Sequence, residues 1–218
     1  MKNSLLLLLL LMVLNSVQAQ DSLQAQRKSF VVVSLSPVIS FAPRFKAGYI
    51  HRLPGRWWAG MVAGYNAGLY NTSYGTPNYR LFEVRPELYF DLRPETKLKH
   101  MASVELFYIN HTDHFTTDEY HDKDDNMYYR YDAADYKRVK TGFNINYSLL
   151  YYITPRLVLW QKIGLGLRNR NVTYSNVTNR SATNPWDLFE FGDSDFLEKE
   201  GSYWNVNFNL ELNVAYKF

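Results

Sequence analysis

The C-terminal segment, residues 204–218, alternates between apolar and polar side chains. Eight of its eight even-numbered positions are apolar, whereas six of its seven odd-numbered positions are polar. The even positions hold Trp204, Val206, Phe208, Leu210, Leu212, Val214, Tyr216 and Phe218. A helix repeats every 3.6 residues and cannot produce this pattern, which is typical of a strand with one apolar face. The segment is therefore predicted to be one long β-strand.

Similar alternation predicts further strands upstream. Four segments repeat the pattern clearly: residues 82–92, 102–108, 139–153 and 157–167. Three segments nearer the N-terminus are less regular: residues 30–35, 45–52 and 57–69. Pro37 and Pro43 interrupt the first pair and place a loop over residues 36–44, because proline cannot donate to a strand ladder. The chain is expected to contain eight strands.

The predicted connections fall into two classes that alternate along the chain. Tight turns cover residues 53–56, 93–97 and 154–156, whereas longer segments cover 36–44, 71–78, 110–137 and 172–202. An even number of antiparallel strands with short turns at one end and long loops at the other is typical of a transmembrane barrel. The predicted fold class is all-β: an eight-stranded antiparallel up-and-down transmembrane β-barrel with short periplasmic turns and long extracellular loops.

A soluble barrel of the lipocalin type would also alternate, with its apolar face turned inward. In this chain the polar face carries both signs of charge in register, which suits a narrow, side-chain-filled lumen. We expect an ion-paired lumen network of Glu83, Arg85, Glu87, Glu105, Lys140, Lys162, Arg168 and Glu211. Aromatic residues gather at both strand ends, as in the girdles of membrane barrels. They are Trp57, Trp58, Tyr151, Tyr152, Tyr216 and Phe218 near the tight turns, and Tyr70, Tyr108, Tyr174 and Trp204 near the loops.

The N-terminus has the pattern of a secretory signal peptide. Lys2 precedes an unbroken apolar run over residues 5–14, and small residues at Val17 and Ala19 form a cleavage site before Gln20. The apolar run is too short for a membrane-spanning helix. Residues 1–19 are therefore expected to be removed, leaving residues 20–218 as an outer-membrane barrel domain with periplasmic N- and C-termini.

Two parts of the sequence resemble known outer-membrane proteins. The C-terminus, with Tyr216 and a final Phe218, looks like the insertion signal that the outer-membrane assembly machinery of Gram-negative bacteria recognises. Residues 35–37, 48–53 and 57–65 are similar to the opening of small Bacteroidetes barrels with the architecture of OmpA, OmpX and OmpW, although Ile50 and His51 depart from the usual Gly-Tyr-Glu-Arg pattern. This resemblance implies a location in the outer membrane, surrounded by lipid and lipopolysaccharide, and implies little about activity.

The segment over residues 110–137 is the strongest candidate for a metal site. It holds His111, His114 and His121 beside Asp113, with eight acidic residues against three basic ones. A His-x-x-His pair with nearby carboxylates can bind zinc, copper or nickel. The calcium-loop interpretation is rejected, because Met127 and Ala133 stand where a glycine and a bidentate glutamate are needed. We favour a solvated acidic surface loop that contacts lipopolysaccharide through divalent ions.

The last long segment contains a short apolar run that suits a helical turn, from Asn184 and Pro185 to Gly192. Its apolar side chains are Trp186, Leu188, Phe189 and Phe191. They either pack as a lid on neighbouring loops or form a docking patch for a protein partner at the cell surface. We favour packing.

Composition excludes several other functions. The net charge of +3 gives no reason to expect nucleic acid, and the absence of cysteine excludes thiolate metal sites and lipid attachment at cysteine. No Gly-x-Ser-x-Gly motif is present, and we expect no cofactor. The favoured function is a non-enzymatic, surface-exposed structural or binding barrel with a plugged polar lumen. The alternatives are an enzyme that modifies lipid A and a barrel that binds a metal or small ligand through its His/Asp-rich loop.

Overall fold

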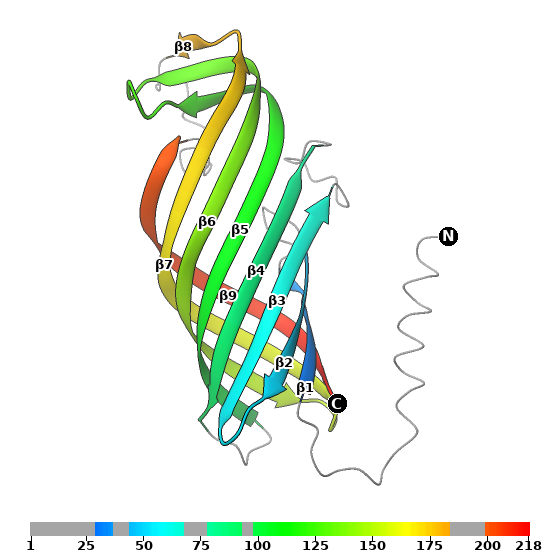
Figure 1. Ribbon diagram of the computed structural model, residues 1–218. Helices are drawn as coiled ribbons and strands as arrows, with labels where there is room; N and C mark the ends of the chain where they lie inside the picture. Colours follow the sequence, from blue (N-terminus) through cyan, green and yellow to red (C-terminus); the bar gives the residue numbers. More distant parts are fainter. Residues whose placement is uncertain (1–28, 37–43, 68–77, 93–97, 184–198) are drawn as a thin grey trace, which may run out of the picture.

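The computed structural model describes residues 29–36, 44–67, 78–92, 98–183 and 199–218. These residues form nine strands (Figure 1): β1 (Ser29–Ser34), β2 (Phe45–Arg52), β3 (Trp57–Ala67), β4 (Arg80–Asp91), β5 (Leu98–His121), β6 (Tyr128–Tyr152), β7 (Leu157–Thr178), β8 (Ser181–Thr183) and β9 (Gly201–Lys217). Among these described residues, no helix is long and apolar enough to cross a membrane.

Eight of the strands close into a ring. Each strand from β1 to β7 pairs antiparallel with its neighbour in sequence, β7 pairs with β9, and β9 pairs with β1. The start of β1 and the C-terminus meet at the tight-turn end, where the amide of Ser29 donates to the carbonyl of Phe218 at 3.2 Å. The short β8 pairs with β6 outside the ring. The predicted eight-stranded antiparallel up-and-down barrel is confirmed.

One segment that we predicted as a loop, residues 110–137, is largely strand, and another, residues 172–202, is partly strand. β5 runs to His121 and β6 begins at Tyr128, so a six-residue turn replaces most of the expected loop over 110–137. β7 continues to Thr178 and takes part of the expected loop over 172–202. The upper parts of β5, β6 and β7, together with the short β8, extend the sheet above the ring (Figure 1). We call this part the β5–β8 extension. The prediction was wrong because it required an apolar face, and the extension carries polar and aromatic side chains on both of its faces.

The alternating side chains of the ring turn their apolar face outward. Ile145, Val206 and Leu210 are more than 60% exposed, whereas Glu83 and Glu105 are fully buried inside. A soluble barrel has the opposite arrangement, because it buries its apolar face. The exposed apolar residues, which include Tyr65, Tyr108 and Trp204, lie on the outside of the ring, and we call them the outer belt.

The lumen is mostly apolar at its tight-turn end, where Asp91 and Lys99 form a buried ion pair beside the apolar side chains. Ten buried residues pack there into one cluster: Phe30, Val32, Ile50, Trp58, Tyr89, Met101, Leu150, Val158, Trp160 and Ala215. The Phe30 ring lies 5.2 Å from that of Trp58 and 6.0 Å from that of Trp160. We call this cluster the aromatic plug.

Three of the expected girdle residues lie elsewhere. Trp58 is 2% exposed inside the aromatic plug, Tyr152 packs against the plug, and Tyr174 is buried in the β5–β8 extension. Trp58 points inward because it follows Trp57 directly, and successive side chains of a strand point to opposite faces. Trp57 remains 45% exposed on the outer belt.

Candidate functional site

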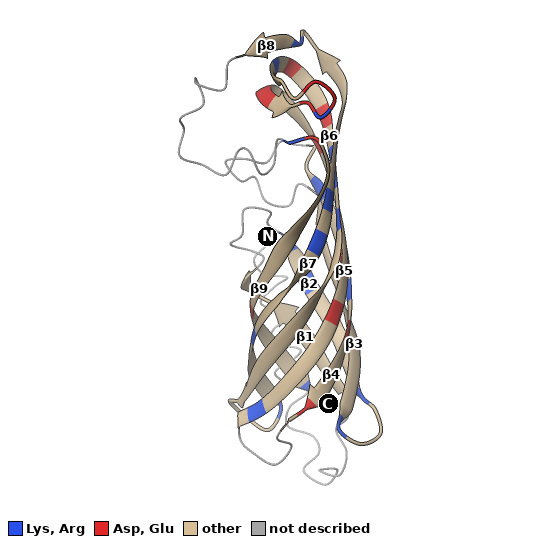
Figure 2. Ribbon diagram, turned by 90° about the vertical axis from the view of Figure 1, so that its left-hand side faces the viewer, with Lys and Arg blue, Asp and Glu red and all other residues tan. Residues whose placement is uncertain are grey.

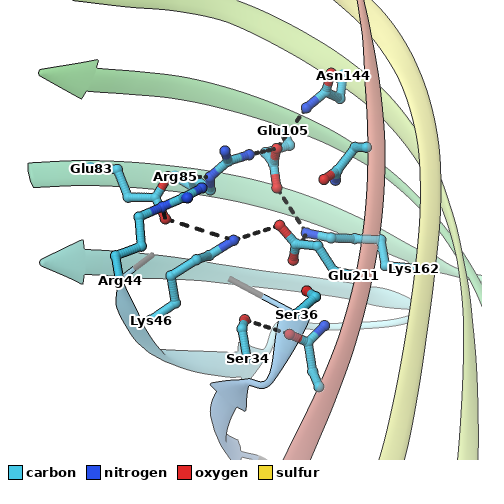
Figure 3. Close-up of polar contacts among 12 residues, drawn as sticks. Ser34, Ser36, Arg44, Lys46, Glu83, Arg85, Glu105, Asn144, Lys162 and Glu211 are labelled. Carbon is cyan, nitrogen blue, oxygen red and sulfur yellow. Dashed lines mark hydrogen bonds and ion pairs between the residues drawn. The ribbon is translucent and has the colours of Figure 1, made fainter. Parts of the chain in front are cut away.

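A buried ion-pair network lies in the lumen (Figure 3), next to the aromatic plug. Lys162 of β7 lies near its centre. Its Nζ is 2.9 Å from Oε2 of Glu87, 2.8 Å from Oε2 of Glu105 and 3.3 Å from Oε2 of Glu211. These carboxylates come from β4, β5 and β9, so one ammonium group connects strands on several sides of the ring.

Two further bases extend the network. Lys46 Nζ lies 2.5 Å from Oε1 of Glu211 and 3.8 Å from Oε1 of Glu83. Arg85 binds Oε1 of Glu105 through Nη1 at 2.7 Å and Oε2 of Glu83 through Nε at 3.2 Å. Each of these side chains is at most 8% exposed, and unpaired charges in such surroundings would be strongly destabilising.

Arg44 completes the charge balance of the network. Its Nε lies 2.8 Å from Oε1 of Glu83, and its side chain is 13% exposed. Four carboxylates therefore face four bases: Glu83, Glu87, Glu105 and Glu211 against Arg44, Lys46, Arg85 and Lys162. We call these eight residues the lumen network.

Neutral side chains satisfy the remaining oxygen atoms of the network. The Asn144 amide donates to Glu105 at 2.8 Å, and Ser103 and Asn146 donate to Oε1 of Glu87 at 2.5 Å and 3.0 Å. The Tyr89 hydroxyl donates to Oε2 of Glu87 at 2.7 Å and so connects the network to the aromatic plug. A cavity of about 10 Å³ lies between the two layers, which is room for about one water molecule.

The structure brings six of the eight sequence-predicted network residues into contact: Glu83, Arg85, Glu87, Glu105, Lys162 and Glu211. The other two, Lys140 and Arg168, face the same lumen but lie nearer the β5–β8 extension. Sequence reasoning missed Arg44 and Lys46. Lys46 could have been found, because it occupies an even position of β2, on the same face as buried Ile50.

The residues proposed for a metal site lie on different faces of β5. His111 and Asp113 point inward, with His111 Nε2 3.8 Å from Oδ2 of Asp113. His114 points outward, where its Nδ1 lies 2.7 Å from Oδ1 of Asp135. His121 lies beyond Thr117, whose φ of 55° interrupts the regular strand, and its ring packs on Tyr128. No group of three metal-ligating side chains forms among the described residues.

The outer face of the β5–β8 extension holds a small polar cluster around Asp135. Hydrogen bonds from His114 at 2.7 Å and from the Asn176 amide at 2.6 Å hold the pKa of Asp135 below its ordinary value. Arg180 lies between β7 and β8, and its guanidinium is 3.5 Å from the centre of the Tyr129 ring and 2.7 Å from Asp122 in the β5–β6 turn. These contacts connect the strands and turns of the extension to one another.

The other predicted sites fall at the ends of the chain or outside the described residues. Tyr216 pairs with Val31 and Leu157, and the Phe218 ring lies 6.1 Å from that of Tyr49. The apolar run with Trp186, Leu188, Phe189 and Phe191 lies outside the described residues, as does the predicted signal peptide.

The chain is similar to known proteins in structure, not in sequence. No family model and no curated protein matches the sequence. The chain is similar to a major outer membrane protein from Thermus thermophilus, with 14% identity and a TM-score of 0.49 over 87% of this chain and 98% of the other. It is similar to Acinetobacter baumannii CarO, with 9% identity and a TM-score of 0.40 over 89% and 97%. It is also similar to the outer membrane protease OmpT from Escherichia coli, with 10% identity and a TM-score of 0.37 over 88% of this chain and 92% of the other.

Proposed function

We propose that this protein is a closed, non-enzymatic barrel of the bacterial outer membrane that holds the β5–β8 extension at the cell surface as a structural or binding element. The observation that carries the proposal is the reversed polarity of the ring. Its outer belt is apolar and exposed, while the lumen network keeps eight charged side chains inside. A soluble monomer would not expose such a belt to water, because exposed apolar patches of soluble proteins rarely exceed a few hundred Å².

Strand length supports the same location. β3 and β4 have 11 and 12 residues, and a tilted strand of about 9–11 residues crosses the hydrocarbon layer. Each ring strand pairs with two neighbours, and β9 pairs with β1 over residues 213–217 to close the ring at its tight-turn end, which satisfies backbone groups where no water can do so. In this location lipid contacts the belt, and lipopolysaccharide surrounds its upper end.

The interior supports a closed barrel. The aromatic plug and the lumen network occupy successive levels, and eight strands leave space for side chains only. A general porin needs a continuous aqueous path, so the protein is proposed not to conduct. Nor does the lumen network expose a carboxylate for acid–base chemistry, because each of its four carboxylates contacts at least one base.

The orientation follows from the two ends. The start of β1, the C-terminus and the turns at Gly55 and Pro155 lie at the plug end, which we assign to the periplasm, where the assembly machinery would recognise Tyr216 and Phe218. The β5–β8 extension then faces outward, where a protein partner could contact it. This direction is usual for barrels whose longer connections are extracellular.

Single cysteines test location and orientation together, since the natural chain has none. Asp124→Cys lies in the β5–β6 turn and Pro155→Cys in the β6–β7 turn. In whole cells, a membrane-impermeant maleimide is expected to label Asp124→Cys, and to label Pro155→Cys only after the outer membrane is permeabilised. The reverse pattern would overturn the orientation, and recovery of the protein in the soluble fraction would overturn the location.

A further inference from the structure

The hairpin that joins β5 to β6 folds back over the β5–β8 extension. Asp113, Tyr136 and Tyr174 lie at one level in the sheet register, and Tyr120 lies seven residues further along β5. Seven residues of extended strand measure about 23 Å. The ring of Tyr120 nevertheless stacks on the ring of Tyr174, with 4.7 Å between their centres. Figure 1 shows the hairpin turned away from the direction of the rising strands. We call residues 118–132 the flap.

The flap begins at three backbone irregularities, one on each long strand of the extension. On β5, Thr117 has a φ of 55°, a left-handed conformation that β-branched residues rarely adopt. On β6 the register shifts between Ala133 and Asp135, and on β7 Asn176 has a φ of 53°. Ala133 pairs with the residue before Thr117 and with the second residue after Asn176, so the irregularities lie at one level. We call this level the crease. Strained backbone of this kind is typical of switch regions.

Glu200 holds the flap against the rest of the extension. Its amide donates to the carbonyl of His121 at 3.0 Å, and His121 pairs with Lys199 as an isolated bridge. The side chain of Glu200 reaches β7, where Oε1 accepts a hydrogen bond from the amide of Tyr174 at 3.4 Å. One residue therefore connects the flap to β7 immediately before β9 begins. We call Glu200 the latch.

The closed flap covers a small aromatic core. Tyr120 and Tyr131 belong to the flap, and they are buried in one cluster with Tyr136, Val172 and Tyr174 from below the crease. This cluster is separate from the aromatic plug, so movement of the flap leaves the ring undisturbed. A segment held by a small core of its own opens at a lower free energy than the whole fold.

The latch carboxylate lies beside other acidic groups, and Figure 2 shows Asp and Glu gathered in the hairpin at the top of the molecule. Burial raises the pKa of Glu200 above its ordinary value, and Asp122 and Asp124 raise it further. The Tyr174 amide and Lys123 act in the opposite direction. The other titratable or charged groups near the latch are His121, Arg180, Lys199 and Tyr203.

The direction of this shift sets the direction of the pH response. A closed flap in which the pKa of Glu200 is raised favours the protonated carboxyl. The closed state therefore has its full stability below the ordinary pKa of 4.5, and loses stability as pH rises through the higher folded value. Above that value Glu200 carries its charge beside Asp122 and Asp124, and like charges disfavour one another.

We propose that the flap is a pH-dependent switch that turns about the crease, closed while Glu200 is protonated and released when Glu200 ionises beside Asp122 and Asp124. Release uncovers the rings of Tyr136 and Tyr174, which the closed flap buries. The extension below the crease keeps its height. This inference goes beyond the proposed function and does not depend on where the protein resides.

The distance between two spin labels tests the switch in the purified full-length protein in detergent, since the natural chain has no cysteine. Met127→Cys carries one label on the exposed turn of the flap, and Asn171→Cys carries the other on the outer face of β7. We expect one distance near pH 4, and a second distance whose share rises severalfold by about pH 7, as the latch ionises. The same single distance at both pH values would overturn the proposal.

Two substitutions in the labelled protein separate the latch from other titrating groups such as His121. Glu200→Gln keeps an oxygen acceptor for the Tyr174 amide and cannot ionise, so the low-pH distance should persist at both pH values. Asp132→Asn removes one negative charge from an exposed position of the flap, where the carboxylate accepts a hydrogen bond from Asn179 at 2.6 Å, and should keep the pH response. A second distance that survives in Glu200→Gln, or a pH response lost equally in both variants, would overturn the role of the latch.

Discussion

Lys162 of β7 binds Glu105 of β5 at 2.8 Å, although β6 lies between their strands. The pair therefore spans the inside of the barrel and does not follow the sheet. Because Lys162 also contacts Glu87 and Glu211, its ammonium group compensates three buried carboxylates at once.

Removal of this ammonium group should be costly. Lys162→Met keeps most of the side-chain volume but leaves three carboxylates undercompensated. Breaking a buried ion pair from one side typically costs about 3–5 kcal/mol. Urea unfolding in liposomes should show a loss of this size. Adding Glu105→Gln to Lys162→Met should recover part of it, and equal stability of the single variant and the natural protein would contradict the network's role.

A charge on the outer belt should be costly only if lipid contacts the belt. Leu165 is 60% exposed on β7 and belongs to the belt. Leu165→Arg should lose about 2–4 kcal/mol of folding free energy in bilayers, as expected for arginine near the midplane. Leu165→Met is the control and should cost far less. A neutral effect of the arginine would argue against a membrane-spanning belt.

The aromatic plug should keep the barrel from conducting. We expect no steady ohmic conductance from the natural protein in a planar bilayer, because Trp58 and Trp160 are each 2% exposed and fill the plug end of the lumen. The double variant Trp58→Gly/Trp160→Gly should admit small conductance steps. Trp57→Gly, which removes an outward-facing indole, serves as the control and should not. Steady conductance of the natural protein would contradict the closed barrel.

The Asp135 carboxylate should titrate at unusually low pH. Its folded pKa lies below the ordinary value of 3.8, chiefly because His114 donates to it and then because Asn176 does. A depressed pKa stabilises the fold above the ordinary value, and the contribution disappears as pH falls through the lower folded value. Carboxyl ¹³C chemical shifts in a His114→Ala variant should show the pKa of Asp135 returning toward 3.8. An unchanged midpoint would show that the hydrogen bond is absent in solution.

The fold was predictable from the sequence in the ring, where each strand needs one apolar face. Alternation located all eight ring strands, because one face of each must be apolar. That rule ends at the upper edge of the belt, so the strands over residues 110–121 and 128–137 were mistaken for a loop. The inward position of Trp58 and Lys46 was available from parity alone. Contacts between particular charges were not, because they depend on the stagger between strands far apart in sequence, as with Lys162 and Glu105.

The β5–β8 extension fixes the height of its tip above the outer belt. From Ile109 to Thr116, the eight residues of β5 before the break at Thr117 continue as regular hydrogen-bonded sheet, which at roughly 3.3 Å per residue measures about 26 Å along the strand. A flexible loop of the same length would sample many heights, whereas a sheet holds its tip at one. Deleting two residues from each of the adjoining strands would lower the tip in steps of about 7 Å without exchanging the two faces. Contact between cells, or with a surface partner, could thus be measured as a function of reach.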